Sequence, residues 1–196
     1  MKGKVLFFGI LLVGLGITIY AVWEIQKGKM SVEETVSEAK NLVSKPSEPV
    51  NNERYTPEKG EVVGLLEIPK INSELAIIEG TDPDELDKGV GHYNGSYFPG
   101  ENGQIVLSGH RDTVFKRLGE LELGDEFVMN LQTGEFTYKI IATKIVDADD
   151  REIITLQNDQ EELIVTTCYP FGFIGDAPER YIIYAEPIQV GKRNHN

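Results

Sequence analysis

The chain contains a single cysteine, Cys168, at the point where an apolar run meets a loop. The run is "ELIVTT" (162–167), and the loop that follows, "YPFGFIGDAP" (169–178), is rich in aromatic residues, glycine and proline. A thiol becomes a nucleophile when a neighbouring group generates or stabilises the thiolate. Spacing alone leaves a second interpretation open, a small buried hydrophobic residue, because free cysteine is among the most buried residue types.

Two histidines are candidates for the partner of such a thiol. His110 follows the apolar run "QIVLSG" (104–109) and precedes a loop, as Cys168 does, whereas His92 sits in the turn-rich "GVGHYNG". Two strand ends that each deliver a reactive side chain to a loop are what a site on a rigid scaffold requires. A structural histidine that bonds a backbone carbonyl is the alternative for each. His195, in the terminal "KRNHN", is expected to be disordered.

Acyl transfer through a thiol also needs a donor for the oxyanion that forms on the attacked carbonyl. Arg180 opens the apolar run "YIIYAEPI" and is the candidate, because its guanidinium stays charged and donates several hydrogen bonds. Arg111, next to His110, is the rival. The alternative for either residue is a solvated surface arginine.

The N-terminal segment 5–23 is apolar and free of charge, and its length suits a membrane-spanning helix. Lys2 and Lys4 precede it, and Tyr20 and Trp23 lie at its far end, where amphipathic aromatics favour the interface. Its length favours a retained anchor over a cleaved signal peptide. We expect a single-pass cell-membrane protein with residues 1–4 cytoplasmic and the remainder extracellular.

The charge distribution excludes one class of partner. The net charge is −13, and all 32 acidic residues lie after the apolar segment. Such a surface repels nucleic acid. A lone thiol in an exported chain cannot form an internal disulfide, and its exposure to oxidation makes its presence worth explaining.

The exported part divides into a stalk and a β domain. Residues 24–59 read as a stalk or linker in which "SVEETVSEAKNLV" (31–43) is a possible short helix with an apolar face, lying against the membrane, the domain or a partner. Proline-rich polar sequence follows it. Residues 60–190 form the predicted catalytic domain, and residues 191–196 form a polar tail.

The predicted fold class is all-β, mainly strands with short helices, closed into a barrel. Closure is favoured because it removes vulnerable sheet edges. A hairpin turn is expected within "NLQTGEF", and two short helices are expected in "TDPDELDKG", with Asp82 as the N-cap, and in "DTVFKRLGE" after Asp112. The expected strands are 62–68, 75–80, 104–109, 126–131, 135–146, 162–167 and 181–188.

The three candidate residues together resemble the sortases, cysteine transpeptidases of Gram-positive bacterial surfaces. That family pairs a strand ending in Gly-His with a later strand ending in Thr-Leu-x-Thr-Cys and an arginine about a dozen positions on. The matching elements are "LSGHRDT", "IVTTC" and Arg180, and the resemblance spans about residues 60–188. Ile164-Val165 departs from the usual Thr-Leu. The stretch "CYPFGFIGDAPERYI" is most similar to class D.

The resemblance implies a sortase β-barrel and a two-step exchange. Cys168 attacks the Thr carbonyl of a Leu-Pro-x-Thr-(Gly/Ala) sorting signal near the C-terminus of a secreted protein, and His110 protonates the departing amine. Arg180 steadies the oxyanion, orients the peptide, or both. An amine of the cell-wall peptide then releases the acyl group, with His110 as base.

Further residues are expected to line the substrate cleft. The candidates are Thr166, Thr167, Tyr169, Phe171 and His92, and for each a purely structural role is the alternative. We expect no cofactor and no metal, because "NGSYFPGENGQ" offers one carboxylate and "DADD" (147–150) lacks the glycine and glutamate of an EF-hand loop. Two other functions remain open, a hydrolytic cysteine peptidase and a non-catalytic anchored β module with Cys168 in its core.

Overall fold

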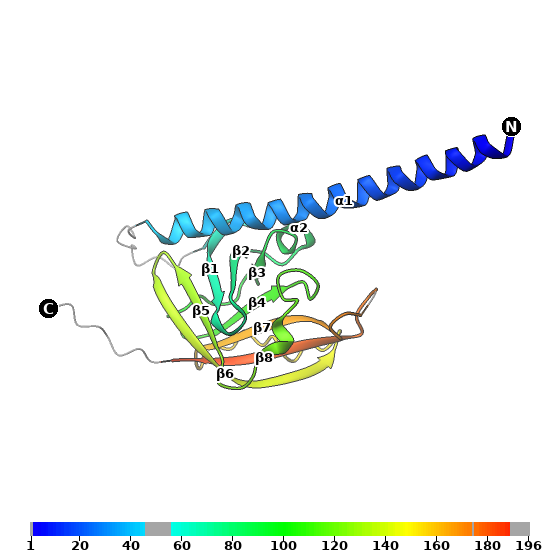
Figure 1. Cartoon of the computed structure of the whole chain (residues 1–196). Coiled ribbons are helices and arrows are strands. Elements are labelled where there is room, and N and C mark those ends of the chain that lie inside the picture. Colours follow the sequence, from blue (N-terminus) through cyan, green and yellow to red (C-terminus); the bar gives the residue numbers. More distant parts are fainter. Residues whose placement is uncertain (1, 46–55, 174, 189–196) are drawn as a thin grey trace.

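Eight strands close into a barrel in the order β1-β2-β3-β4-β7-β8-β6-β5 within the described residues (Figure 1). The computed structural model describes residues 2–45, 56–173 and 175–188. Strands β2 with β3 and β4 with β7 pair in parallel, and the other neighbours are antiparallel. The strands are β1 (Val62–Ile68), β2 (Ser73–Glu79), β3 (Val90–His92), β4 (Gln104–Gly109), β5 (Glu126–Leu131), β6 (Gly134–Asp147), β7 (Glu162–Tyr169) and β8 (Glu179–Pro187).

The predicted closed β-barrel is confirmed, and each of the seven expected strands has an observed counterpart. The hairpin turn falls where expected, since Leu131 of β5 pairs with Gly134 of β6. The sequence did not predict β3. This strand has only three residues and follows Gly89. It joins the sheet by a parallel pairing with β2, which the local sequence pattern does not predict.

The helix expected after Asp112 is wrong in type. Residues 111–117 form turns, and the 3-10 helix η2 (Leu118–Glu120) follows. The backbone N–H groups of Lys116, Leu118 and Glu120 bond the carbonyl three residues back, not four. Gly119 weakens an α-helix here, and its missing side chain makes room for the ring of Phe171.

The other short helix, α2 (Pro83–Leu86), begins after Asp82, as predicted. Asp82 makes no side-chain capping bond, because its carboxylate pairs with the ammonium of Lys59 instead. A second 3-10 helix, η1 (Pro69–Ile71), joins β1 to β2.

The barrel interior is a single apolar cluster drawn from every strand of the barrel, with Tyr138, Phe127 and Phe115 among its largest fully buried side chains. A smaller cluster covers the outer face of β4, β6, β7 and β8. It consists of Val106, Val146, Ile153, Ile164 and Ile182. The loop that contains Ile153 therefore packs on the outside of the barrel, and Gln104 at the start of β4 donates a hydrogen bond to the carbonyl of Ile153 (3.3 Å).

The long helix α1 (Lys2–Val43) includes both the apolar segment and residues 31–43. The C-terminal part of this helix lies along the barrel (Figure 1). The expected short helix is the last part of this longer one, because no proline interrupts residues 2–43. Ala39 is fully buried against β1 and β2. Thr35 donates a hydrogen bond from Oγ1 to the carbonyl of Lys88 (2.7 Å), and the ammonium of Lys40 lies 2.6 Å from Glu74. Of the three surroundings considered for residues 31–43, the domain itself is the one that the structure shows.

The apolar part of α1 leaves the barrel and exposes its side chains, including Phe7, Ile17 and Trp23. Among the described residues it is the one helix long and apolar enough to cross a membrane. Residues 46–55, which make up most of the proline-rich segment after α1, and the polar tail with His195 lie outside the described residues.

Candidate active site

The strand register brings the three predicted catalytic residues side by side. Cys168 on β7 is the direct cross-strand partner of Arg180 on β8. On its other side β7 runs parallel to β4, and Gly109 is aligned with Thr167, so His110 and Cys168 each follow an aligned pair. Adjacent strands lie about 4.8 Å apart. His110 and Arg180 therefore occupy positions on either side of Cys168, on or directly after the two neighbouring strands.

Side-chain alternation places these three residues on the outer face of the barrel. Successive side chains of a strand point to opposite faces. The interior residues on these strands are Ile105 and Leu107 on β4, Leu163 and Val165 on β7, and Ile183 and Ala185 on β8. His110, Cys168 and Arg180 are out of phase with all of them and share the opposite face. Each is partly exposed.

The end of β4 is shaped to present His110. The N–H of Phe115 donates a hydrogen bond to the carbonyl of His110 (3.0 Å), which folds the following turns back over the strand. A Cβ atom at Gly109 would lie 2.6 Å from the ring of Phe115, so only glycine fits beneath it. The Nε2 atom of His110 lies 3.6 Å from a carboxylate oxygen of Asp87, and the imidazole remains 38% exposed.

Of the two threonines before Cys168, one faces the site and one does not. Thr167 is buried, and its hydroxyl donates a 2.7 Å hydrogen bond to the carbonyl of Gly109. It therefore joins the ends of β4 and β7 and holds the two reactive positions in register. Thr166 is partly exposed on the same face as Cys168 and pairs across the sheet with Ser108. Thr166 and Ser108 form the outer-face floor next to the thiol.

The two arginines have different surroundings. Arg180 donates from Nη1 to the carbonyls of Ala177 (3.2 Å) and Glu179 (2.9 Å), so its guanidinium is bonded to backbone just before and at the start of its own strand. Arg111, the rival, donates from Nη2 to the carbonyls of Phe173 (2.7 Å) and Gly175 (2.8 Å). Arg180 is thus the arginine aligned with Cys168, and Arg111 is engaged with the loop.

The expected aromatic substrate residues belong to a packed cluster. Tyr169 and Phe171 meet edge to face at 5.6 Å between centroids, and Tyr181 lies 6.1 Å from the first and 5.5 Å from the second. Phe171 and Tyr181 also pack against the barrel interior. Alternation places Tyr169 on the other face of β7 from Cys168. The cluster therefore supports the strand ends from inside.

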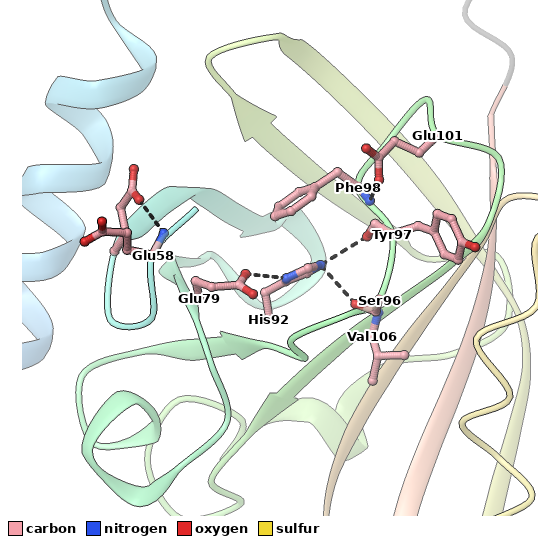
Figure 2. A network of polar contacts seen from close by, with 9 residues as sticks. Glu58, Glu79, His92, Ser96, Tyr97, Phe98, Glu101 and Val106 are labelled. Carbon is pink, nitrogen blue, oxygen red and sulfur yellow. Dashed lines mark hydrogen bonds and ion pairs between the residues drawn. The ribbon is translucent and has the colours of Figure 1, made fainter. Parts of the chain in front are cut away.

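His92 lies apart from the site, in a buried polar network (Figure 2). Its side chain is 1% exposed, and its Nδ1 atom lies 2.6 Å from a carboxylate oxygen of Glu79. On the other side Nε2 donates to the carbonyl of Tyr97 (3.1 Å) and lies 3.0 Å from the hydroxyl of Ser96. Phe98 stacks on the ring at 4.1 Å. Among the expected substrate residues, His92 is one that peptide cannot reach.

Two neighbours of the site were missed from the sequence. Ser108 was predictable, because it stands two residues before His110 on the same strand and therefore shares its face. Asp87 was not, because it reaches His110 from the end of α2, an element distant in sequence.

A groove of about 1020 Å³ lies between α1 and the barrel and approaches the site through Asp87. Its lining residues come from four segments, within 24–33 of α1, 71–75, 84–88 and 112–117, and acidic and basic side chains stand both on α1 and on the barrel side.

Comparisons with known proteins show the family and agree with the fold. The family model described as the sortase domain matches residues 66–188. Sortase D of Bacillus subtilis (strain 168) is 53% identical over 195 residues, covering 94% of this chain and 98% of the relative.

Two solved structures share the fold at similar levels. A Clostridium perfringens sortase D5 transpeptidase has a TM-score of 0.68 and 25% identity, covering 81% of this chain and 99% of that one. A C. perfringens sortase C determined with the C-terminal cell wall sorting motif has a TM-score of 0.62 and 27% identity, covering 84% and 91%. With the family model matching most of the barrel domain, this chain belongs to the sortase family of cysteine transpeptidases.

Proposed function

We propose that Cys168, His110 and Arg180 are the catalytic residues, and that they cleave a Leu-Pro-x-Thr-(Gly/Ala) sorting signal and transfer its acyl part to an amine of the cell-wall peptide. The observation that supports the proposal is the register: Cys168 is paired with Arg180, His110 directly follows the Gly109–Thr167 pair, and all three residues share the outer face of the barrel. The similarity to a sortase C solved with a cell wall sorting motif supports the substrate class.

In the proposed acyl transfer, Cys168 and His110 each act once in each half-reaction. The Cys168 thiolate adds to the Thr carbonyl carbon, and Arg180 donates hydrogen bonds to the resulting oxyanion or to the peptide beside it. The C–N bond then breaks, and protonated His110 gives its proton to the departing amine. The product is a thioester on Cys168. In the second half-reaction the acceptor amine attacks this thioester, His110 takes the amine proton, and the thiolate leaves.

A thioester suits this transfer because it conserves the acyl group of the cleaved amide without a further energy source. It also fixes the order of the two substrates, since the amine acts only after the first product has formed. The outer-face floor of Ser108 and Thr166 lies where the peptide would approach the thiol.

We also propose that α1 anchors the enzyme in the cell membrane, with residues 1–4 cytoplasmic, residues 5–23 spanning the bilayer and the barrel extracellular. The basic N-terminal flank, the exposed apolar side chains of the helix and the aromatic residues Tyr20 and Trp23 support this orientation. Because residues 31–43 are docked on the barrel, the catalytic domain would sit close to the membrane surface.

The transfer step separates this proposal from hydrolysis. The full-length protein in detergent is incubated with a quenched sorting-signal peptide, with and without an added amine, and the products are identified by mass. We expect cleavage that depends on Cys168 and an amide product when the amine is present. Hydrolysed peptide alone at every amine concentration would instead indicate a cysteine peptidase. The non-catalytic module with a core thiol is not supported, because Cys168 is partly exposed.

A further inference from the structure

Arg111 joins the two loops that border the candidate site. It directly follows His110, and its Nη2 group donates hydrogen bonds to the carbonyls of Phe173 (2.7 Å) and Gly175 (2.8 Å). Its guanidinium carbon also lies 5.8 Å from the centroid of the Phe173 ring, within cation–π range. One side chain on the histidine loop therefore holds the loop of residues 170–178, which connects Cys168 to Arg180.

The tip of that loop, residues 172, 173 and 175, makes few other contacts. In the described part of the chain, the remaining hydrogen bond at the tip is a turn bond from the N–H of Phe173 to the carbonyl of Pro170 (3.4 Å). Gly172 and Gly175 both have positive φ, at 74° and 99°. Such angles favour glycine and mark places where the backbone changes direction. The two flanks of the loop are held separately, by the packing of Phe171 on the barrel and by the bond from Arg180 to the carbonyl of Ala177. Among the described residues at the exposed tip, the contacts that reach the rest of the barrel domain are those of Arg111 with Phe173 and Gly175.

The residue that this contact places is Phe173, whose side chain is 47% exposed. Singly exposed apolar side chains are common on protein surfaces, so the exposure of Phe173 alone assigns it no role. Its position, fixed by Arg111, is what distinguishes it. Here the ring stands at the border of the site, next to the residue that follows His110. An apolar wall in this position suits the leucine and proline side chains of the proposed peptide.

We propose that Arg111 is a positioning residue that latches the loop of residues 170–178 and thereby places Phe173 as a wall of the peptide cleft. The inference rests on the proposed function for the identity of the peptide. It assigns Arg111 no part in proton transfer or in oxyanion stabilisation. Its effect on the reaction passes through the loop.

A double-mutant cycle tests this latch in the full-length enzyme. Arg111→Ala removes the latch, Phe173→Ala removes the wall, and kcat and KM for the sorting peptide are measured for both and for the double variant. We expect Arg111→Ala to lower kcat/KM about tenfold, mainly through KM. In the Phe173→Ala background the same change has little further effect, because the ring that the latch places is already gone.

Two readouts separate a latch from a direct effect on the reacting groups. The rate at which iodoacetamide alkylates Cys168 should be unchanged in Arg111→Ala, because this small reagent needs no peptide cleft. Amide hydrogen exchange in residues 170–178 should become faster. Lys116→Ala removes a positive charge from the same turns and is the matched control, expected to change kcat/KM less than about twofold.

The proposal is overturned by additive effects of the two alanine substitutions, by wild-type kcat/KM in Arg111→Ala, or by an alkylation rate that falls in parallel with kcat/KM. The exchange measurement requires no peptide. If the wild-type enzyme forms no acyl-enzyme with any Leu-Pro peptide, the proposed function fails, and faster exchange in Arg111→Ala still reports the latch.

Discussion

The molecule holds two histidines in opposite environments. His92 is buried, both of its ring nitrogens are engaged, and an aromatic ring stacks on its face (Figure 2). His110 is partly exposed, and among the described residues its ring has one ion-pair contact, with Asp87 at 3.6 Å. A histidine whose two ring nitrogens are both hydrogen-bonded within the fold has no free nitrogen with which to bind a substrate. A histidine at a strand end with an accessible nitrogen can take up and release a proton.

The same contrast separates the two sets of polar side chains to which these histidines belong. Glu79, His92 and Ser96 are each at least nine-tenths buried and bond one another, so they stabilise the fold. Cys168 and Arg180, with His110, are aligned by the sheet and face outward. Sequence context suggested chemistry for both histidines, and burial is what distinguishes them.

The largest expected effect is on activity at the exposed set. His110→Ala should lower the rate of acyl-enzyme formation by about a thousandfold, because the departing amine then lacks its proton donor. The free energy of unfolding should change by less than about 0.5 kcal/mol, since the side chain is partly exposed. Stopped-flow acylation and urea titration measure the two quantities. A near wild-type acylation rate in this variant would contradict the assignment of His110 as the reactive histidine.

The reverse pattern is expected for His92→Ala. Removing one partner of a buried pair leaves the carboxyl group of Glu79 without its partner and should cost about 3–5 kcal/mol of stability. The kcat of the protein that remains folded should stay within about threefold of wild type. Urea titration gives the first value, and activity normalised to the folded fraction gives the second. A catalytic defect without loss of stability would show that His92 acts in the reaction.

A smaller effect on stability is expected from Glu79→Gln, which keeps a polar group against Nδ1 but removes the acidic proton site. We expect a cost of about 2 kcal/mol. Combined with His92→Ala, the two substitutions should cost less than the sum of their separate effects, because they break the same contact. Additivity within experimental error would mean that the 2.6 Å contact contributes little to stability.

The smallest expected effect concerns a second structural pair, at the end of β7 opposite to Cys168. The hydroxyl of Tyr138 donates to Glu161 (2.7 Å), and burial, then this hydrogen bond, raises the pKa of Tyr138 well above its usual value. Tyr138→Phe should cost about 1 kcal/mol at neutral pH and leave acylation unchanged. A loss of acylation would contradict the division between structural and reactive groups.

The pH dependence of the same pair has a definite sign. In the unfolded chain the phenol ionises near pH 10, whereas in the fold it stays neutral, so unfolding releases a proton above that pH. The stabilising contribution is therefore complete below about pH 10 and is lost as the pH rises, by up to about 1.4 kcal/mol per pH unit. Urea titrations between neutral and alkaline pH should show this slope in the wild type and a shallower one in Tyr138→Phe.

Much of the barrel was predictable because most of its strands are alternating or apolar runs bounded by turn residues. The short strand β3 was not, because three residues carry no periodicity and its partner is distant in sequence. The helix after Asp112 was predicted wrongly, because the turns there are set by the contact of Phe115 with Gly109 and of Phe171 with Gly119. Such long-range contacts leave no local pattern.

The candidate site was predictable in its residues more than in its surroundings. Cys168 and His110 both follow apolar strands, and this common position suggested a shared site before any coordinates. Thr167 looked like a substrate contact, but strand alternation turns it inward onto Gly109. Asp87 and the loop contacts of Arg111 come from elements far apart in the chain, and only the folded structure brings them together.

The most direct test of the central proposal is the intact mass of the full-length protein after incubation with a Leu-Pro-x-Thr-(Gly/Ala) peptide, followed by peptide mapping. We expect a mass increase equal to the acyl half of the peptide, located on Cys168, lost on treatment with hydroxylamine and missing from Cys168→Ala. An unmodified Cys168 with every peptide of this class, or an adduct on another residue, would contradict the assignment of this thiol as the nucleophile.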